Sequence, residues 1–372
     1  NQIGGIREDE PLFAEEELHF YGQPIALIVA KDAFTARKAK ALIKLDVEEF
    51  EVVTDPREAY KRGDLLFPSR SFQMGILEEA WSDCEYIFEG RADIGGQEHL
   101  YIETQGSYAY PTDNGSIKIH SSTQGPTAVQ KTAARVLGLP MHRIEVDVAR
   151  LGGAFGGKED QASGFATMVA LAAYVMKKPV KITLDRPDDM QMTGKRHPYS
   201  ADYKIGLSKD LKIVAYQTTL YQNGGAASDL SPAIMERTLF HSTNSYYVPN
   251  THVTVHSCKT NLPPNTAFRG FGAPQGVFTI ESAIAHAADE LNIPAYEIQK
   301  VNFIHDGQAF QYGQIAENVN NKATFEQALN QYDFTRIEKE AADYNQKHID
   351  KKRGVSIMPI CFGISFTKTP MN

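Results

Sequence analysis

The pattern of apolar and polar positions near the amino terminus predicts a strand, a helix and a second strand. An apolar run at residues 25–30 is followed by a helical stretch at residues 33–42 and by alternating apolar and polar residues at 43–47. Continuous apolar runs and strict alternation are both typical of strands. We therefore expect residues 1–63 to form part of a small α/β module whose beginning precedes Asn1.

Residues 64–82 mix proline, glycine and charged residues, which predicts a linker. Residues 83–345 are expected to form one larger mixed α+β domain. Its expected strands are 85–91, 106–110, 117–120, 144–148, 180–184, 201–206 and 212–221. Its main expected helices begin at Pro126, pass through Phe165 to Met176, and cover 278–291. Strand-like character returns at 354–367, so residues 346–372 are expected to begin a further domain that a partner segment completes.

Composition narrows the classes of function. The formal net charge is -8, whereas a nucleic-acid-binding protein needs a basic surface to neutralise phosphates. No apolar run approaches the roughly 18 residues of a membrane span. The three cysteines stand singly, without the spacing of a zinc or iron–sulfur site. We expect reduced thiols in a cytoplasmic protein, and any electron carriers on other segments or subunits.

The strongest local signal is the glycine-rich segment Gly152–Glu159 between an expected strand and an expected helix. Glycines allow tight turns and close approach of the backbone to a bound group, and unpaired N–H groups at a helix start attract anions. The spacing nearly matches a phosphate-binding P-loop but has Glu159 where a magnesium-ligating Ser or Thr is required. A plain strand-to-helix turn remains the alternative.

Two further segments have the character of ligand-facing loops. Asn265–Gly276 places Arg269 between two aromatic residues and next to glycines, which suits a loop that presents a charge and a ring. Its alternative is a surface loop with a solvated arginine. Gln124 stands at the entry to a helix and offers an amide donor, although helix capping by its neighbours would also explain the segment. Arg237 alone would be a solvated charge on a helix.

Some polar residues carry weaker signals. Glu98, His99 and Glu103 lack the spacing of metal ligands on one helix face, so hydrogen bonding between strands is the favoured interpretation. Arg196 precedes a His-Pro pair and is expected in a turn.

Taken together, these segments resemble the molybdenum hydroxylase family, and the resemblance runs in the family's order over nearly the whole chain. The stretches that carry it are Gly95–Thr104, Ser122–Gln124, Gly152–Glu159, Ile234–Arg237, Lys259–Leu262, Asn265–Gln275 and Phe362–Thr367. The resemblance implies an α+β fold, in which a truncated α/β hammerhead-like module precedes a mixed molybdopterin-binding domain. One departure is Ala154, where the family more often has glycine.

The resemblance also implies a reaction. The family hydroxylates a carbon beside a ring nitrogen by attack of a molybdenum-bound hydroxide, while a hydride passes to a sulfido ligand. Electrons then leave through 2Fe-2S clusters to FAD, on other segments or subunits. The implied partners are the carboxyl-terminal half of the molybdenum portion and a second copy of the assembly. The catalytic base is expected beyond Asn372, so this chain is expected to be inactive alone.

Site residues carried over from the family fall into two groups. The expected molybdenum shell consists of Gln124, Phe155 and Arg269, and the backbone of Gly153, Ala154 and Gly156 is expected at the same cofactor. The expected substrate-binding residues are Glu159, Arg237 and Phe271.

A carboxyl and a guanidinium together favour purines, hypoxanthine and xanthine being oxidised to uric acid, because arginine can neutralise charge that develops on the ring. Relatives that take aldehydes tend to have apolar residues at both positions. Hydroxylation of another N-heterocycle or of an aldehyde, and a scaffold that lost its cofactor, remain alternatives.

Overall fold

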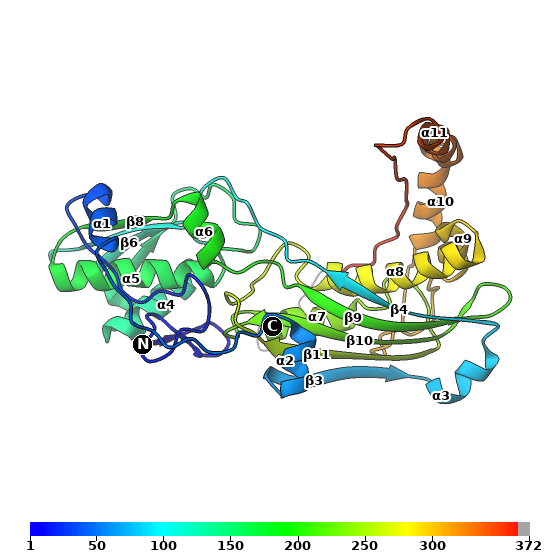
Figure 1. Ribbon diagram of the computed structural model, residues 1–372, viewed down its shortest axis with the longest axis horizontal. Coiled ribbons are helices and arrows are strands. Elements are labelled where there is room, and N and C mark those ends of the chain that lie inside the picture. Colours follow the sequence, from blue (N-terminus) through cyan, green and yellow to red (C-terminus); the bar gives the residue numbers. More distant parts are fainter. Residues whose placement is uncertain (364–372) are drawn as a thin grey trace.

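The computed structural model describes residues 1–363 and shows two lobes, each built on one β-sheet (Figure 1). The mixed architecture confirms the predicted α+β class. None of the helices in this described range is long and apolar enough to cross a membrane.

The smaller lobe is a four-stranded sheet with two helices packed on it. Its strands are β5 (Gly106–Pro111), β6 (Ile117–Ser121), β7 (Ile144–Asp147) and β8 (Val180–Thr183), in the order β7-β6-β5-β8. Helices α4 (Pro126–Leu137) and α5 (Gln161–Met176) pack against each other and the sheet. Ile119, Val129 and Ala166 are among the fully buried residues of the core between them. The strands and both helices were predicted from the apolar pattern.

The larger lobe is a five-stranded sheet with the order β3-β11-β10-β9-β4. These strands are β3 (Leu65–Met74), β4 (Tyr86–Ile94), β9 (Tyr199–Leu207), β10 (Ile213–Gly225) and β11 (Asn250–Lys259). Only β10 and β11 run parallel; the other pairs are antiparallel. Helix α8 (Ala273–Leu291) packs on β4 and β9, and α7 (Ser231–Phe240) packs on β11 and α8. The main hydrophobic core lies between these helices and the sheet.

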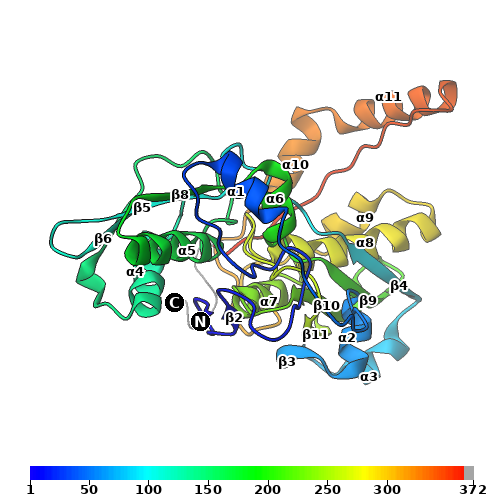
Figure 2. The same ribbon diagram turned by 60° about the vertical axis from the view of Figure 1, so that its left-hand side comes forward.

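The remaining elements are short or peripheral. They are β1 (Gln2–Ile3), β2 (Glu10–Pro11), α1 (Ala33–Lys40), α2 (Pro56–Arg62), α3 (Leu77–Ala80), η1 (Trp81–Asp83), η2 (Met141–Arg143), α6 (Arg186–Met192), α9 (Ala295–Val301), α10 (Asn321–Gln331) and α11 (Phe334–Lys347). Helices α10 and α11 project away from the larger lobe (Figure 2).

The amino-terminal module differs from its prediction. The helix at 33–42 is confirmed as α1, but 25–30 and 43–47 form no strands. A strand requires a hydrogen-bonded neighbour, and none of the described residues pairs with either segment. The alternating side chains Ile43, Leu45 and Val47 are consequently more than half exposed.

The predicted linker at 64–82 is wrong, because β3, α3 and most of η1 occupy it. The strand β3 was not predicted because it contains Pro68, and proline disfavours a strand. Pro68 lies in an edge strand that pairs only with β11, at a shift of register between Phe67 and Arg70. Proline is tolerated in edge strands and bulges, since it has no N–H to donate to a second neighbour.

The strand-like character predicted at 354–367 is also not confirmed where it is described. Residues 354–363 form no strand and run alongside α8. Residues 364–367 lie outside the described range, and the proposed start of a further domain at 346 stays a prediction.

Candidate functional site

Loops from the two lobes meet at their junction. The smaller lobe contributes residues 122–125 between β6 and α4, and residues 148–160 between β7 and α5. The larger lobe contributes residues 260–272 between β11 and α8. Isolated bridges join Arg196 to Gln97 and to Thr266 of the larger lobe's loop. All nine predicted site residues lie in these loops or on the adjacent helix α7.

The glycine-rich loop has a backbone that few other residues could follow. Gly153, Phe155 and Gly156 have φ values of 95°, 54° and 105°, in the region that glycine adopts without steric cost. A Cβ at Gly156 would stand 2.7 Å from the carbonyl oxygen of Ala267. Glycine at this position therefore lets the loop of the smaller lobe touch the loop of the larger lobe.

Gln124 is oriented by this loop. Its Oε1 accepts hydrogen bonds from the backbone N–H groups of Gly156 at 3.0 Å and Lys158 at 3.4 Å. Since a backbone N–H can only donate, the carbonyl end of the amide is the end bound to the loop. The Nε2 donor consequently faces away from it, and the side chain is exposed.

Phe155 and Arg269 are joined directly. The backbone N–H of Arg269 donates to the carbonyl of Phe155 at 2.8 Å. The Phe155 ring is 48% exposed, although its backbone is in a strained, left-handed conformation. Strain of this kind persists where surrounding contacts fix it and is common at binding sites. The three predicted residues Gln124, Phe155 and Arg269 thus belong to one continuous set of contacts.

Arg196 holds the backbone next to Arg269 in place, a role that the sequence did not predict. Only 9% of it is exposed. Its guanidinium donates to the carbonyls of Phe268 (3.4 Å) and Arg269 (2.9 Å) and to Oε1 of Gln97 (2.9 Å). It also lies 4.1 Å from the Phe268 ring centroid. Burial lowers the pKa of Arg196 to about 10, which leaves it charged at neutral pH.

His99 also packs against the Phe268 ring. It stacks on Phe268 at 4.6 Å between centroids and donates from Nε2 to the carbonyl of Ala267 at 2.7 Å. A Cβ at Gly157 would meet the His99 ring at 2.8 Å. In residues 1–363 there is no group of three or more His, Cys, Asp or Glu side chains suited to a metal ion. His99 and Glu103 are hydrogen-bonded, but they lie in the segment between β4 and β5 and not in the predicted pair of strands.

The lysine of the near P-loop is buried. Lys158 has no exposed side-chain surface, and its ammonium group donates to the carbonyl of Glu103 at 2.7 Å and to the Ser122 hydroxyl at 2.6 Å. A P-loop lysine must reach the phosphates. The nucleotide-binding interpretation of this loop is therefore wrong.

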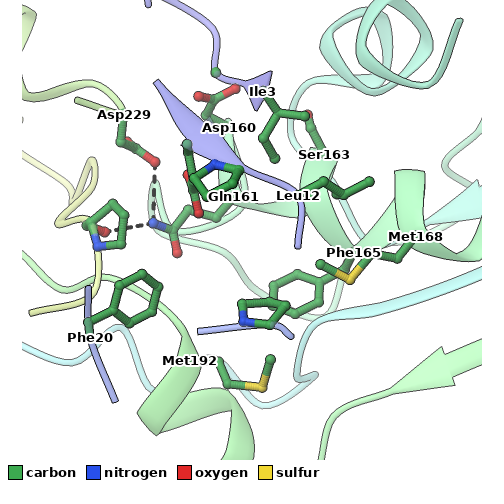
Figure 3. Close-up of a pocket in the computed structure, with 16 residues that line it drawn as sticks. Ile3, Leu12, Phe20, Asp160, Gln161, Ser163, Phe165, Met168, Met192 and Asp229 are labelled. Atoms are coloured by element: carbon green, nitrogen blue, oxygen red, sulfur yellow. Dashed lines mark hydrogen bonds between the residues drawn. The ribbon is translucent and has the colours of Figure 1, made fainter. Parts of the chain in front are cut away.

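Glu159 is half-buried where the loop leads into α5. Burial raises the pKa of Glu159 above its ordinary value, and the nearby Asp160 raises it further. Two residues after Glu159, Gln161 hydrogen-bonds to Asp229 and to the carbonyl of Pro264 in the larger lobe (Figure 3). Glu159 thus lies at the junction.

Arg237 and Phe271 lie on neighbouring elements of the larger lobe. Arg237 is 4% exposed, donates to the carbonyl of Gly363 at 3.1 Å, and lies 5.0 Å from the Phe362 ring centroid. Phe271 packs on a buried cluster that includes Ile234, one turn before Arg237. The Thr238 hydroxyl bonds to Gly272, which fastens α7 to the Phe271 loop.

Several hydrogen-bond donors at the junction have no acceptor among the described residues. Within residues 1–363, no acceptor is bonded to the backbone N–H groups of Gly153, Ala154 and Phe155, to Nε2 of Gln124 or to the guanidinium of Arg269. Backbone N–H groups and arginine together are suited to anionic, oxygen-rich ligands. The donor set fits a molybdenum cofactor, whose oxo and phosphate oxygens are acceptors.

This fold and donor set define a cofactor-binding domain for an anionic prosthetic group, and comparison with known proteins identifies its kind. The family described as "Molybdopterin cofactor-binding domain" matches residues 60–303. The family described as "Aldehyde oxidase and xanthine dehydrogenase, a/b hammerhead domain" matches residues 1–51. Residues 60–303 thus include β3, in agreement with its place in the larger sheet.

Individual relatives agree. A xanthine dehydrogenase of Oryza sativa subsp. japonica is 39% identical over 100% of this chain and 28% of its own length. Nicotinate hydroxylase hnxS of Emericella nidulans is 37% identical over 98% of this chain and 28% of its own length. The solved aldehyde oxidoreductase of Desulfovibrio gigas is 25% identical, with a TM-score of 0.81 over 92% of this chain and 38% of that protein. The chain belongs to the xanthine dehydrogenase-like molybdenum hydroxylases.

Proposed function

We propose that this chain contributes the cofactor face and part of the substrate pocket to an enzyme that hydroxylates purines. The observation that carries this proposal is the presence of two opposite charge types, one on each lobe. Glu159, a carboxyl with a raised pKa, lies in the loop before α5, and Arg237, a buried guanidinium, lies on α7. An apolar aldehyde pocket has no use for either group.

The residues at the junction would hold the cofactor from one side. Gln124 would donate from Nε2, the backbone of Gly153–Gly156 would donate its N–H groups, and Arg269 would supply positive charge. When bound, a molybdenum cofactor supplies a centre that accepts two electrons from the carbon being hydroxylated. Because the donors are fixed before the ligand arrives, little reorganisation accompanies binding.

Glu159, Arg237 and Phe271 would recognise the substrate. Phe271 offers a ring face for stacking on a flat heterocycle, worth about 1 kcal/mol beyond area burial. Arg237 would stabilise negative charge that develops on the ring, with a strength that burial increases. Glu159 would hold or share a proton at a ring nitrogen, which its raised pKa favours.

The chain spans about 28% of the length of the curated relatives that it matches. We propose that other segments or subunits supply 2Fe-2S and FAD, the remaining molybdopterin contacts and the catalytic base, and that the assembly dimerises. Three free thiols, at Cys84, Cys258 and Cys361, support a cytoplasmic location, where thiols stay reduced.

Turnover by the full-length protein tests the substrate class. We expect xanthine and hypoxanthine to be hydroxylated with a much larger kcat/KM than nicotinate or benzaldehyde. Glu159→Val and Arg237→Met should each lower the purine value by about 100-fold while leaving benzaldehyde less affected. Unchanged kcat/KM for xanthine in Glu159→Val would remove the role assigned to Glu159, and a xanthine kcat/KM below those of nicotinate and benzaldehyde would exclude purines as the substrate class.

Nicotinate is the second candidate substrate, favoured by the relative of that name with 37% identity. Nicotinate carries a carboxylate that an arginine can pair with but that Glu159 would repel. Glu159→Gln should therefore raise kcat/KM for nicotinate and lower it for xanthine. Metal analysis of the purified assembly tests the scaffold alternative, since a protein without molybdenum would be no hydroxylase.

A further inference from the structure

We propose that Glu103 and Lys158 form a positioning pair that holds both ends of the glycine-rich loop and thereby aims Gln124 and the loop N–H groups at the cofactor. Lys158 has no exposed side-chain surface, so the pair acts through the loop. For the part that concerns the cofactor, this inference rests on the proposed function; for the part that concerns the loop, it rests on contacts alone.

Lys158 closes the carboxyl-terminal end of the loop. Its ammonium group donates to the carbonyl oxygens of Glu103 (2.7 Å) and Thr104 (3.4 Å) and to the Ser122 hydroxyl (2.6 Å). It also lies 4.4 Å from the centroid of the Tyr101 ring. An ammonium group has three donors, so its capacity is used while the side chain is wholly buried.

Glu103 closes the amino-terminal end. Its Oε2 accepts from the backbone N–H of Gly152 at 2.7 Å and from the Ser122 hydroxyl at 2.8 Å. The same oxygen lies 3.6 Å from the ammonium nitrogen of Lys158. Glu103 therefore contacts both ends of the loop. Its carboxylate bonds to Gly152 and lies near the ammonium group of Lys158, which also donates to the Glu103 carbonyl.

The hydrogen bonds around Lys158 extend to Gln124 through the main chain. The carbonyl of Lys158 accepts from the backbone N–H of Gln124 at 2.8 Å and from the Thr123 hydroxyl at 3.2 Å. The N–H groups of Gly156 and Lys158 donate to Oε1 of Gln124. Moving Lys158 therefore moves the support on which the Gln124 amide is oriented.

The choice of a charged residue has a physical consequence. Burial lowers the pKa of Lys158 and opposes the charge, whereas the Glu103 carboxylate favours it. A buried charge is stable only with its partners in place. The loop is thus held in the one arrangement that satisfies the ammonium group, rather than in any arrangement that packs well.

The test uses the full-length protein with Lys158→Met, which keeps length and removes the donors. Val129→Ala, in the apolar core of the same lobe, serves as a control that lowers stability without touching the loop. Lys178→Met, an exposed lysine, controls for loss of one charge. The readouts are amide hydrogen exchange in residues 122–125 and 152–158, molybdenum content, the Mo(V) EPR spectrum, and kcat and KM.

We expect exchange in both segments to rise at least tenfold in Lys158→Met and to stay near wild type in both controls. Supporting groups of metal sites typically change affinity or activity by roughly 10–100-fold. We expect that loss in kcat or molybdenum content, an altered Mo(V) spectrum, and KM within about twofold. Wild-type exchange, molybdenum content and spectrum in Lys158→Met would overturn the inference.

If Lys158→Met does not fold, Glu103→Gln and Ser122→Ala carry the same test, each with a smaller rise in exchange. In a double-mutant cycle, Glu103→Gln should add little to the effect of Lys158→Met, because the two residues act as a unit. Additive effects would count against the pair. A wild-type protein without molybdenum would refute the proposed function alone, and loop exchange would then decide the positioning role.

Discussion

Oε1 of Gln124 accepts a hydrogen bond from the backbone N–H of Gly156 at 3.0 Å, and this contact, with the longer one from Lys158, decides which end of the amide faces the junction. The glycine-rich loop thus orients the side chain of Gln124. Exchanging the carbonyl and amide ends would place a donor against a donor, which costs the desolvation of a buried polar group.

Gln124→Glu separates the two functions of this side chain. A carboxylate can still accept from Gly156, but it has no N–H to donate. We expect an unchanged thermal midpoint and a fall in kcat of about 100-fold, in the range seen when one preorganised donor is removed. Thr127→Ala, exposed in the first turn of α4, is the control. Wild-type turnover in Gln124→Glu would show that the amide donor has no part in the reaction.

Gly156→Ala tests the contact between the lobes. Its Cβ would stand 2.7 Å from the Ala267 carbonyl oxygen, at a φ of 105°. The matched control is Gly138→Ala, where φ is 65° and no atom lies within 4 Å of the added carbon. The control should cost about 1 kcal/mol of unfolding free energy from conformation alone, and Gly156→Ala about 2 kcal/mol more. Equal losses in urea denaturation would refute the close approach.

Arg196→Lys should not be conservative. Lysine keeps the charge but cannot bond to the Phe268 and Arg269 carbonyls and to Gln97 with one planar group. We expect a loss of about 2–3 kcal/mol in stability together with lower molybdenum content. Arg336→Lys, on the exposed helix α11, should change neither quantity. Normal stability and metal content in Arg196→Lys would show that the loop needs no such support.

A cluster of acidic residues around Glu10 predicts that the free energy of unfolding depends on pH. Glu10 lines a cavity with Asp160 and Asp229 (Figure 3). Burial, then the charges of Asp160 and Asp9, raise the pKa of Glu10 from 4.5 to about 8. Between these values the folded chain retains a proton that the unfolded chain has released, so the unfolding free energy falls as pH rises from 4.5 to 8.

Glu10→Gln should remove this slope. We expect the stability difference between wild type and variant to shift by about 3.5 kcal/mol between pH 5 and pH 8, in favour of the variant at the higher pH. Urea denaturation at several pH values measures it, and Glu16→Gln, exposed nearby, supplies the control. Parallel curves for wild type and Glu10→Gln would contradict the predicted protonation.

Local signals in the sequence were sufficient for the regular elements of the smaller lobe. Pro126 begins α4 and Gly138 ends it in a left-handed conformation, as residues with those backbone preferences do. The strands of that lobe followed from alternation because one face of the sheet is covered by helices and buried. The glycine-rich loop was found because its backbone requires glycine at defined places.

Other features depend on contacts between distant segments, which no local pattern records. Arg196 and Lys158 resemble ordinary surface cations in the sequence, and only their burial against carbonyls 73 and 55 residues away shows their roles. The predicted strand at 43–47 failed for the same reason, because alternation gives the face of a strand and not its partner. The individual ligand roles of Gln124, Phe155 and Arg269 stay predictions.

The meeting of loops from two separate sheets also dictates when the pocket can exist during synthesis. Gln124 and the glycine-rich loop emerge early, but Arg269 follows more than a hundred residues later, after β9, β10 and β11. A nascent chain with one finished lobe offers only half of the donors. If these residues hold the prosthetic group as proposed, its loading must wait until Arg269 has been made and the lobes have docked.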